Sequence, residues 1–580
     1  MRRPRLPAAL AFALLAVLSP SRSAISQAPA RPAAAPPAGE PFTESIDVRV
    51  VNVEVFVTDR DGHPVTGLGK DDFELAEDGR PVAITNFYAQ AYAQTAPAAP
   101  AAPGSPAAPA AAAPAEAPAA VPEAQRLDLG IFVDNLNLTP VARNRVLGAV
   151  KDFVASHVTA GDRVLLASFD GSVRIRQAPT RDPKALVAAV DEISRSTPRG
   201  AHASRDLRNI LQTISGTFGG SANNNAMVAS LPHEVELFVK ERYDEDRASL
   251  AALDDFIGSL AGLPGRKALL FVSGGMSLRP GEVALQAFAD KFGQQMANDI
   301  PRPNEAEIQP LLTKIVARAN ASRVTLYGIG APEDFNSFAL EIGAAASNNL
   351  QFVTRDNLAG VMRTVSDFTG GFAGIDLNDP KVLLDRLRGD LETFYSLGFS
   401  PVHAADGKDH KVAVRVKNAK GLTVRTREHY RDRDEGQRLT DRASATLAFG
   451  VQDNPLGMKL VLERDEPGKD KNRVVSILVV FPTEKLVLVP GEAASTGRVT
   501  LFVGSRDEHG RLSPINRIDV PLTIPAARVA AHQPAAYRVR LALRPEAQTV
   551  AVAARDELGK TESTIAALYQ PAAAPKAPGQ

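Results

Sequence analysis

The sequence contains no cysteine and no tryptophan among its 580 residues. The absence of cysteine excludes disulfide bonds, a thiolate nucleophile and cysteine-ligated zinc, although it does not identify a cellular compartment. Lysine plus arginine equals aspartate plus glutamate, at 66 each, so the chain has no net charge. A neutral chain has no general electrostatic reason to bind nucleic acid or an anionic membrane. We therefore expect no nucleic-acid partner.

The sequence also lacks an apolar run of the ~20 residues that a transmembrane helix needs. Three arginines near the N-terminus precede the apolar stretch 6–18, and small residues follow it. This order is typical of a secretory signal peptide, and Ser26 and Ala28 suit the positions before a cleavage site. Residues 1–28 are therefore predicted to be a signal peptide, and the protein to be periplasmic or secreted. An uncleaved membrane anchor is the less favoured alternative.

Composition divides the rest of the N-terminal region into modules. Residues 29–43 form a tether rich in proline and alanine, and residues 89–125 form a linker of the same kind. Such segments cannot bury enough apolar surface to offset the entropy of ordering. Between them, residues 44–88 alternate apolar and polar residues around Asp-Gly turns, which predicts a small β module. The tail at residues 571–580 is expected to be disordered.

Residues 126–370 alternate apolar strands with amphipathic helices. This pattern predicts a mostly parallel sheet covered by helices on both faces. A short Asp-Gly hairpin within residues 162–178 predicts one antiparallel edge strand, and LQFVT (350–354) is expected to be a late strand. The Gly/Asn-rich stretch 216–232 is expected to be a loop.

The C-terminal part of the chain is β-rich. Residues 371–435 are expected to be a β-rich extension of the α/β domain, with the charged run 431–438 as a solvated connector. Many short strands separated by turn residues predict a β-sandwich over residues 440–570. The predicted fold class is therefore multidomain, with a central doubly wound, Rossmann-like α/β domain flanked by β-rich, sandwich-like domains.

Asp134 ends the first expected strand of the α/β domain, at the edge where doubly wound sheets bind ligands. A strand-terminal aspartate together with one antiparallel edge strand resembles the von Willebrand factor type A (vWA) domain. The resemblance covers residues 46–430. Within this range the order of phrases such as FTGG (368–371) and LETFYSLGFSP (391–401) is similar to the vWA-related proteins abundant in Acidobacteria.

The resemblance implies a position for a divalent cation, the metal-ion-dependent adhesion site. In the family, an aspartate and two serines after the first strand, a threonine and a second aspartate bind the ion. Here the serine positions fall on Leu136 and Leu138, the threonine on Ala201 and the second aspartate on Ser273. Leucine and alanine offer no oxygen to a hard cation. We therefore expect a degenerate site with no metal and no cofactor, with Asp134 as its remnant. Mg²⁺ or Ca²⁺ binding is the disfavoured alternative.

Three loops at this edge are expected to recognise a partner. They are Asp134–Thr139, Arg199–Ser204 and Ser273–Ser277. The candidate partner-binding residues are Asp134, Asn135, Asn137, Thr139, Arg199, His202, Ser204, Ser273 and Ser277. The sequence Thr139-Pro140 also suits the start of a helix, so capping is an alternative role for this polar stretch.

No catalytic constellation is visible in the sequence. FVSGG (271–275) lacks the glycine that a nucleophile elbow requires two residues before its serine. His202 and His233 are interpreted as surface residues, and no histidine has an evident triad context. TDRDG (58–62) matches only the first half of a calcium loop and is interpreted as a turn. We therefore expect no catalytic residue and no enzymatic activity.

The favoured function is that of an exported vWA-domain binding or adhesion-type protein that recognises a protein or glycan partner. The alternative is a structural component of a cell-envelope assembly, in which the β modules make the contacts. A metal-dependent adhesion module and a hydrolase are less favoured.

Overall fold

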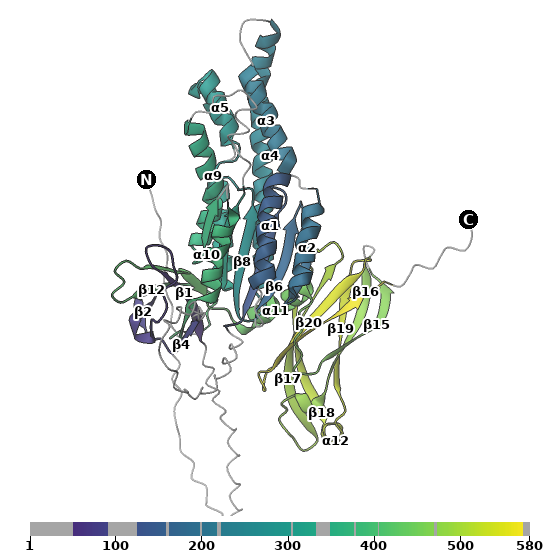
Figure 1. Cartoon of the computed structure of the whole chain (residues 1–580). Coiled ribbons are helices and arrows are strands. Elements are labelled where there is room, and N and C mark those ends of the chain that lie inside the picture. The colour runs from purple at the N-terminus through teal and green to yellow at the C-terminus, as the bar shows by residue number, and fades with distance from the viewer. Residues whose placement is uncertain are drawn as a thin grey trace, which may run out of the picture. The chain divides into compact units, whose positions relative to one another are not determined.

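The computed structural model of the chain describes residues 50–90, 125–157, 162–197, 200–216, 222–302, 305–331, 348–375, 379–403, 405–468 and 472–571 (Figure 1). The predicted signal peptide (1–28), the tether (29–43), most of the linker (89–125) and nearly all of the tail (571–580) lie outside these ranges. Among the described residues, no helix has the length and apolar character needed to cross a membrane.

One six-stranded sheet has the strand order β10-β9-β8-β5-β6-β7. All neighbouring strands are parallel except β7, which is antiparallel to β6 at one edge. The strands are β5 (Leu127–Asp134), β6 (Arg163–Phe169), β7 (Val173–Thr180), β8 (Arg266–Ser273), β9 (Val324–Gly330) and β10 (Phe372–Ile375). The mostly parallel sheet and its single antiparallel edge strand are those that the sequence predicts. The mixed α/β, multidomain class is therefore confirmed.

Helices cover both faces of this sheet. One face packs on α1 (Pro140–His157), α2 (Pro183–Arg195) and α10 (Pro380–Glu392). The other face packs on α4 (Ala222–Leu260), α7 (Glu305–Ala321) and α9 (Asn348–Asp367). All eight residues of β5 are buried, which is expected for a strand covered on both faces. The expected strand at 350–354 is wrong, because these residues lie inside α9 and β10 supplies the last strand instead.

A group of helices has a hydrophobic core separate from the sheet. It comprises α3 (Gly200–Gly216), the first half of α4, α5 (Glu282–Phe292) and α6 (Gln294–Asn298), and we call it the helical extension (Figure 1). The loop expected at 216–232 is therefore wrong from residue 222 onwards. Leu231, Val235 and Phe238 recur at helical spacing and bury themselves between α3 and α5, and Pro232 is accommodated within α4.

Two four-stranded sheets combine strands from both sides of the α/β domain. Their orders are β13-β1-β11-β4 and β14-β12-β2-β3, and they share one hydrophobic cluster. The strands are β1 (Val51–Thr58), β2 (Phe73–Glu77), β3 (Arg80–Val82), β4 (Asn86–Gln90), β11 (Phe394–Phe399), β12 (Asp409–Val416), β13 (Thr423–Thr426) and β14 (His429–Arg431). We call this pair of sheets the split β unit. The predicted segments 44–88 and 371–435 thus contribute strands to the same two sheets, although β10 belongs to the α/β sheet.

Local sequence explains one hairpin of the split β unit. Asp78 and Gly79 connect β2 to β3 with φ values of 48° and 79°. Two successive positive φ values match the tight turn that Asp-Gly favours between antiparallel strands. The turn also places Glu77 and Asp78 at the end of β2.

The C-terminal strands form two further sheets with a shared core. Their orders are β15-β16-β19 and β18-β17-β20-β21. The elements are β15 (Lys459–Pro467), β16 (Arg473–Phe481), β17 (Ala494–Asp507), β18 (Asn516–Pro525), α12 (Ala526–Ala530), β19 (Ala535–Leu543), β20 (Gln548–Asp556) and β21 (Glu562–Tyr569). The described residues also contain the 3₁₀ turns Lys70–Asp72 and Thr483–Lys485.

Helix α11 (Glu435–Phe449) precedes these sheets, and Asp434 forms a capping box with Gln437 at its start. Phe449 packs on the α/β core, whereas Leu439 and Ala443 pack on β17 and β20. Within the expected solvated connector at 431–438, Asp432 is buried and residues 435–438 form the first turn of α11, whose side chains are exposed or half-buried. The buried apolar residues of the helix begin at Leu439.

Buried ion pairs link the split β unit to the α/β domain. Arg425 of β13 makes a bidentate contact with Asp390 of α10, with distances of 2.7 and 2.9 Å. Glu54 of β1 pairs with Arg323 just before β9. Burial raises the pKa of Glu54, but Arg323 and Arg427 outweigh this effect and lower it overall.

We predict that Asp390→Ala destabilises the fold by about 3–5 kcal/mol, because it leaves the charge of Arg425 buried without its partner. Arg431→Ala is a matched control, since Arg431 contacts Asp409 at 2.9 and 2.7 Å on the surface. An exposed pair contributes only about 0–1 kcal/mol. Urea unfolding of both variants measures the difference, and equal losses would contradict the prediction.

Candidate functional site

Asp134 lies at the carboxyl end of β5, in a buried polar cluster. Its Oδ2 accepts hydrogen bonds from Asn137 Nδ2 at 2.8 Å and from Ser273 Oγ at 2.9 Å. Its Oδ1 accepts one from Ser249 Oγ at 3.2 Å. Asp134, Ser249 and Ser273 are each 0% exposed. Both carboxylate oxygens of Asp134 therefore accept hydrogen bonds from other side chains of the protein.

The fold explains why these side chains meet. Strands β5 and β8 are parallel neighbours with Val133 opposite Val272, so the next residues, Asp134 and Ser273, end side by side. Ser249 comes from the second half of α4, whose first half belongs to the helical extension. The cluster was not predictable as a whole, because Ser249 lies in a region where no motif marks it.

The loop after β5 and the loop after β8 are in close backbone contact. A Cβ atom added to Gly274 would lie 1.8 Å from the carbonyl oxygen of Asn137. Only glycine fits such a close approach of two backbones. The loop after β8 therefore packs directly on the loop after β5, at the place where the family resemblance implies a cation.

Asn135 belongs to a separate network. Its amide donates to Ser196 Oγ at 3.2 Å and accepts from Arg143 Nη1 at 3.2 Å. Arg143 is buried and also donates to the backbone carbonyls of Ser194 and Ser196. Burial lowers the pKa of Arg143. This network fixes the start of α1 to the end of α2, which is a structural role.

The other predicted residues are dispersed. The carbonyl oxygen of Thr139 accepts a hydrogen bond from the backbone of Arg143, at the start of α1. Ser277 is buried, and its backbone N–H lies 3.4 Å from Asp246 Oδ2. His202 is exposed and Ser204 half-buried on α3, and Arg199 lies outside the described residues. The structure therefore brings together Asp134, Asn137 and Ser273 of the predicted set.

Burial dominates the electrostatics of this edge. It raises the pKa of Asp134, against the opposing effect of the hydrogen bonds from Asn137, Ser273 and Ser249. Burial also raises the pKa of Asp246 on α4 to about 8, because the neighbouring charge of Arg242 only partly offsets it. Hard cations take roughly six or more oxygen ligands, and the groups that contact the Asp134 carboxyl are Asn137 Nδ2 and the hydroxyls of Ser249 and Ser273.

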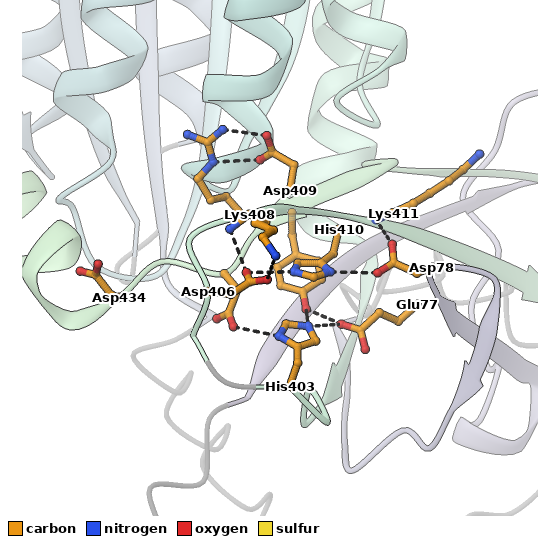
Figure 2. A network of polar contacts seen from close by, with 12 residues as sticks. Glu77, Asp78, His403, Asp406, Lys408, Asp409, His410, Lys411 and Asp434 are labelled. Carbon is orange, nitrogen blue, oxygen red and sulfur yellow. Dashed lines mark hydrogen bonds and ion pairs between the residues drawn. The ribbon is translucent and has the colours of Figure 1, made fainter. Parts of the chain in front are cut away.

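A second polar cluster lies in the split β unit, and Figure 2 shows its contacts. His403 Nε2 lies 3.2 Å from Glu77 Oε1, and His403 Nδ1 lies 3.4 Å from Asp432 Oδ2. His410 bridges two carboxylates, with Nδ1 2.9 Å from Asp78 and Nε2 3.2 Å from Asp406. The two imidazole rings stack with their centroids 4.0 Å apart and an interplanar angle of 17°. We call these six residues the histidine–carboxylate cluster.

Backbone hydrogen bonds hold the loop of this cluster. Asp406 Oδ1 accepts the backbone N–H of Lys408 at 2.9 Å, and Gly407 turns the chain with a φ of 71°. The backbone of Gly407 and Lys408 pairs with both backbone groups of Asp432. The side chains of Asp406 and Asp432 are therefore carried by backbone segments that are joined directly.

Sequence reasoning missed this cluster. The only local signal is HAADGKDH (403–410), in which two histidines and two aspartates fall within one short loop. Glu77 ends β2, which precedes the α/β domain in the chain, and Asp432 follows β14, which comes after that domain. No spacing in the sequence therefore links these two residues to this loop.

The charges within the cluster affect one another. Hydrogen bonding to His410 lowers the pKa of Asp78, and the backbone N–H of Lys408 lowers that of Asp406 to about 2. Burial lowers the pKa of His410, but its hydrogen bonds to Asp78 and Asp406 outweigh burial and raise it overall. Both aspartates are therefore ionised at neutral pH.

No family model matches the chain, and no curated protein is similar to it. Solved structures with partial similarity include the vWF domain of the type V pili tip protein Mfa5 from Porphyromonas gingivalis. It is 10% identical, with 46% of this chain and 94% of that chain covered and a TM-score of 0.24. BatB, a conserved hypothetical protein from Bacteroides thetaiotaomicron, is 9% identical, with 46% and 97% covered and a TM-score of 0.22.

The manganese-loaded TRAP protein from Plasmodium vivax is 11% identical, with 53% of this chain and 96% of that chain covered and a TM-score of 0.21. Similarity at this level carries no argument about activity. The vWA-like description of the six-stranded sheet rests on its own strand order and its single antiparallel edge.

Asp246 gives a pH-dependent prediction. Its pKa is about 8 in the folded chain, whereas an unfolded aspartate titrates near ~3.9. The folded state binds the proton more tightly, so this residue's contribution to stability falls as pH rises from about 4 to about 8. Asp246→Asn removes this pH-dependent loss of stability, because asparagine carries no titratable group.

We therefore expect Asp246→Asn to match the wild type near about pH 4 and to be more stable by several kcal/mol near about pH 8. Thermal unfolding across this range measures the effect. Asp244→Asn, an exposed position on the same helix, is the control and should show no such trend. If the Tm of the two variants changed with pH in the same way, the raised pKa of Asp246 would be contradicted.

Proposed function

We propose that the chain is an exported binding or adhesion-type protein, of the vWA-related kind, that recognises a protein or glycan partner without a metal ion at Asp134. The observation that supports this proposal most is the burial of Asp134 beneath α4, with hydrogen bonds from Asn137, Ser249 and Ser273. A partner cannot reach a carboxylate that is 0% exposed. Export is supported by the arginine-then-apolar order of the first residues.

The burial of this edge changes where recognition is proposed. In doubly wound sheets, ligands bind beyond the carboxyl ends of the strands. Here the helical extension stands at that edge and has its own core (Figure 1). The surface offered to a partner is therefore the outer face of the helical extension, which includes the exposed Leu237 and Met296, rather than the loops around Asp134 and Ser273.

A second candidate is a structural component of a cell-envelope assembly. A specific observation favours it, because half of the exposed large hydrophobic side chains among the described residues lie on the strands β15 and β21 or in the segments between the C-terminal strands. These are Val461, Val487, Val489, Leu512, Leu558 and Leu568. Apolar side chains on a surface mark contact sites when they gather in one region.

We also propose that the chain is not an enzyme. Ser273, the one serine that follows a strand in a partial nucleophile motif, is fully buried and donates its hydroxyl hydrogen bond to Asp134. A nucleophile needs a base as its hydrogen-bond partner, and the substrate must be able to reach it. The burial of Ser273 prevents a substrate from reaching its hydroxyl.

Matched variants discriminate the two candidate functions. Leu237 and Leu568 are 53% and 57% exposed, on the helical extension and on β21 respectively. We expect Leu237→Asp to reduce retention of the full chain on a glycan array or on immobilised cell-envelope proteins by at least about tenfold, as loss of a central apolar contact does. Leu568→Asp should retain the wild-type level.

The opposite pattern, with retention lost in Leu568→Asp and kept in Leu237→Asp, would favour the structural component. Both positions are exposed, so neither substitution removes a core contact. Circular dichroism of the two variants checks that each remains folded.

A further inference from the structure

We propose that the histidine–carboxylate cluster binds a divalent transition-metal ion of the zinc class, between His403 Nδ1 and the carboxylates of Asp406 and Asp432. These three residues each offer a ligand atom, and the three atoms lie within 4.8 Å of one another. The site lies in the split β unit, apart from the Asp134 edge, and it is independent of the proposed binding function.

The spacing of the donor atoms suits a small tetrahedral ion. His403 Nδ1 and Asp432 Oδ2 are 3.4 Å apart. Zinc bonds of about 2.0–2.2 Å at tetrahedral angles place neighbouring ligand atoms about 3.3–3.6 Å apart. An ion can therefore enter between these two atoms with little movement of either side chain.

The surrounding residues orient the ligands. Glu77 Oε1 lies 3.2 Å from His403 Nε2, so it favours the tautomer in which Nε2 carries the proton and Nδ1 carries the lone pair. The hydroxyl of Tyr430 donates to the same oxygen of Glu77 and fixes it. A carboxylate behind a histidine ligand is the usual arrangement in metal sites. His410 holds the second ligand, because its Nε2 lies 3.2 Å from Asp406 Oδ1. Its Nδ1 lies 2.9 Å from Asp78 Oδ2, which fixes the imidazole ring.

Charge balance favours a cation at this place. Four carboxylates converge here, and the side chains of Glu77 and Asp432 are only 5% and 7% exposed. Lys408 contacts Asp406 at 3.4 Å but is 77% exposed. A buried carboxylate needs a counter-charge, and a divalent ion would supply one to Glu77 and Asp432.

Two neighbouring cations, Arg431 and Lys411, are directed elsewhere. Arg431 makes a bidentate contact with Asp409, and the side chain of Lys411 extends away from the cluster in Figure 2. Asp78 accepts the backbone N–H of Lys411 instead. These two side chains therefore do not supply a counter-charge within the cluster.

The donor set also indicates the class of metal. Imidazole nitrogen suits zinc and similar transition metals, whereas magnesium and calcium prefer oxygen ligands alone. Three protein ligands leave a further position for water, as in open zinc sites. His403 and Asp406 are partly exposed, so an ion can reach the site from solvent.

The test uses the full chain, stripped of metal with a chelator and then dialysed against zinc chloride. We expect one zinc ion per chain by elemental analysis and a higher Tm with zinc than without, because a ligand of the folded state stabilises it. Cobalt loading should give the visible absorption of a tetrahedral site. His403→Ala and Asp406→Asn should each weaken zinc binding by at least about tenfold.

A matched control comes from a second group of potential ligands, Asp59, Asp61 and His63, which lies on an exposed turn. His63→Ala should keep the wild-type stoichiometry and Tm shift. The proposal is overturned if the wild type retains no zinc, or if His63→Ala rather than Asp406→Asn removes it. Asp406 lies on an exposed turn, so Asp406→Asn keeps the test decisive even where His403→Ala does not fold.

Discussion

The antiparallel pairing of β1 with β11 and β13 is the constraint on which much of the structure depends. It joins a strand before the α/β domain to strands that follow it, with Val55 opposite both Tyr395 and Thr426. Because the strands of one sheet come from both ends of the α/β domain, the buried pair of Arg425 and Asp390 can form. The same arrangement brings Glu77 of β2 next to the loop after β11. The histidine–carboxylate cluster therefore exists only in the folded, paired state.

At the carboxyl edge of the six-stranded sheet, burial decides the chemistry. The Asp134 carboxyl receives hydrogen bonds from Asn137, Ser249 and Ser273, and burial raises its pKa. The buried carboxyl group of Asp134 links the sheet to α4 through Ser249. A solvated carboxylate would instead attract a cation. The burial of Asp134 underlies the proposed role of the α/β domain. In this role the helical extension contacts the partner, and no metal ion takes part.

The alternating strands and helices between residues 126 and 370, and the antiparallel edge strand, were predictable because apolar periodicity reports burial directly. The first part of α4 was not, since its asparagine-rich sequence is typical of loops, and the residues that pack against α3 and α5 begin only at Leu231. At the site, Asp134 and Ser273 were predictable from strand ends. Ser249 and the pairing of His403 with Glu77 were not, because contacts between distant segments leave no spacing in the sequence.

The central claim is that Asp134 serves as a buried hydrogen-bond acceptor and not as a cation ligand. Thermal unfolding of the full chain, after chelation and then with added Mg²⁺, tests it most directly, with Asp134→Asn measured in parallel. The account predicts that Mg²⁺ leaves the Tm of the wild type unchanged, because Asn137, Ser249 and Ser273 already occupy the carboxyl oxygens. A marked rise of Tm with Mg²⁺ that Asp134→Asn abolishes would contradict it.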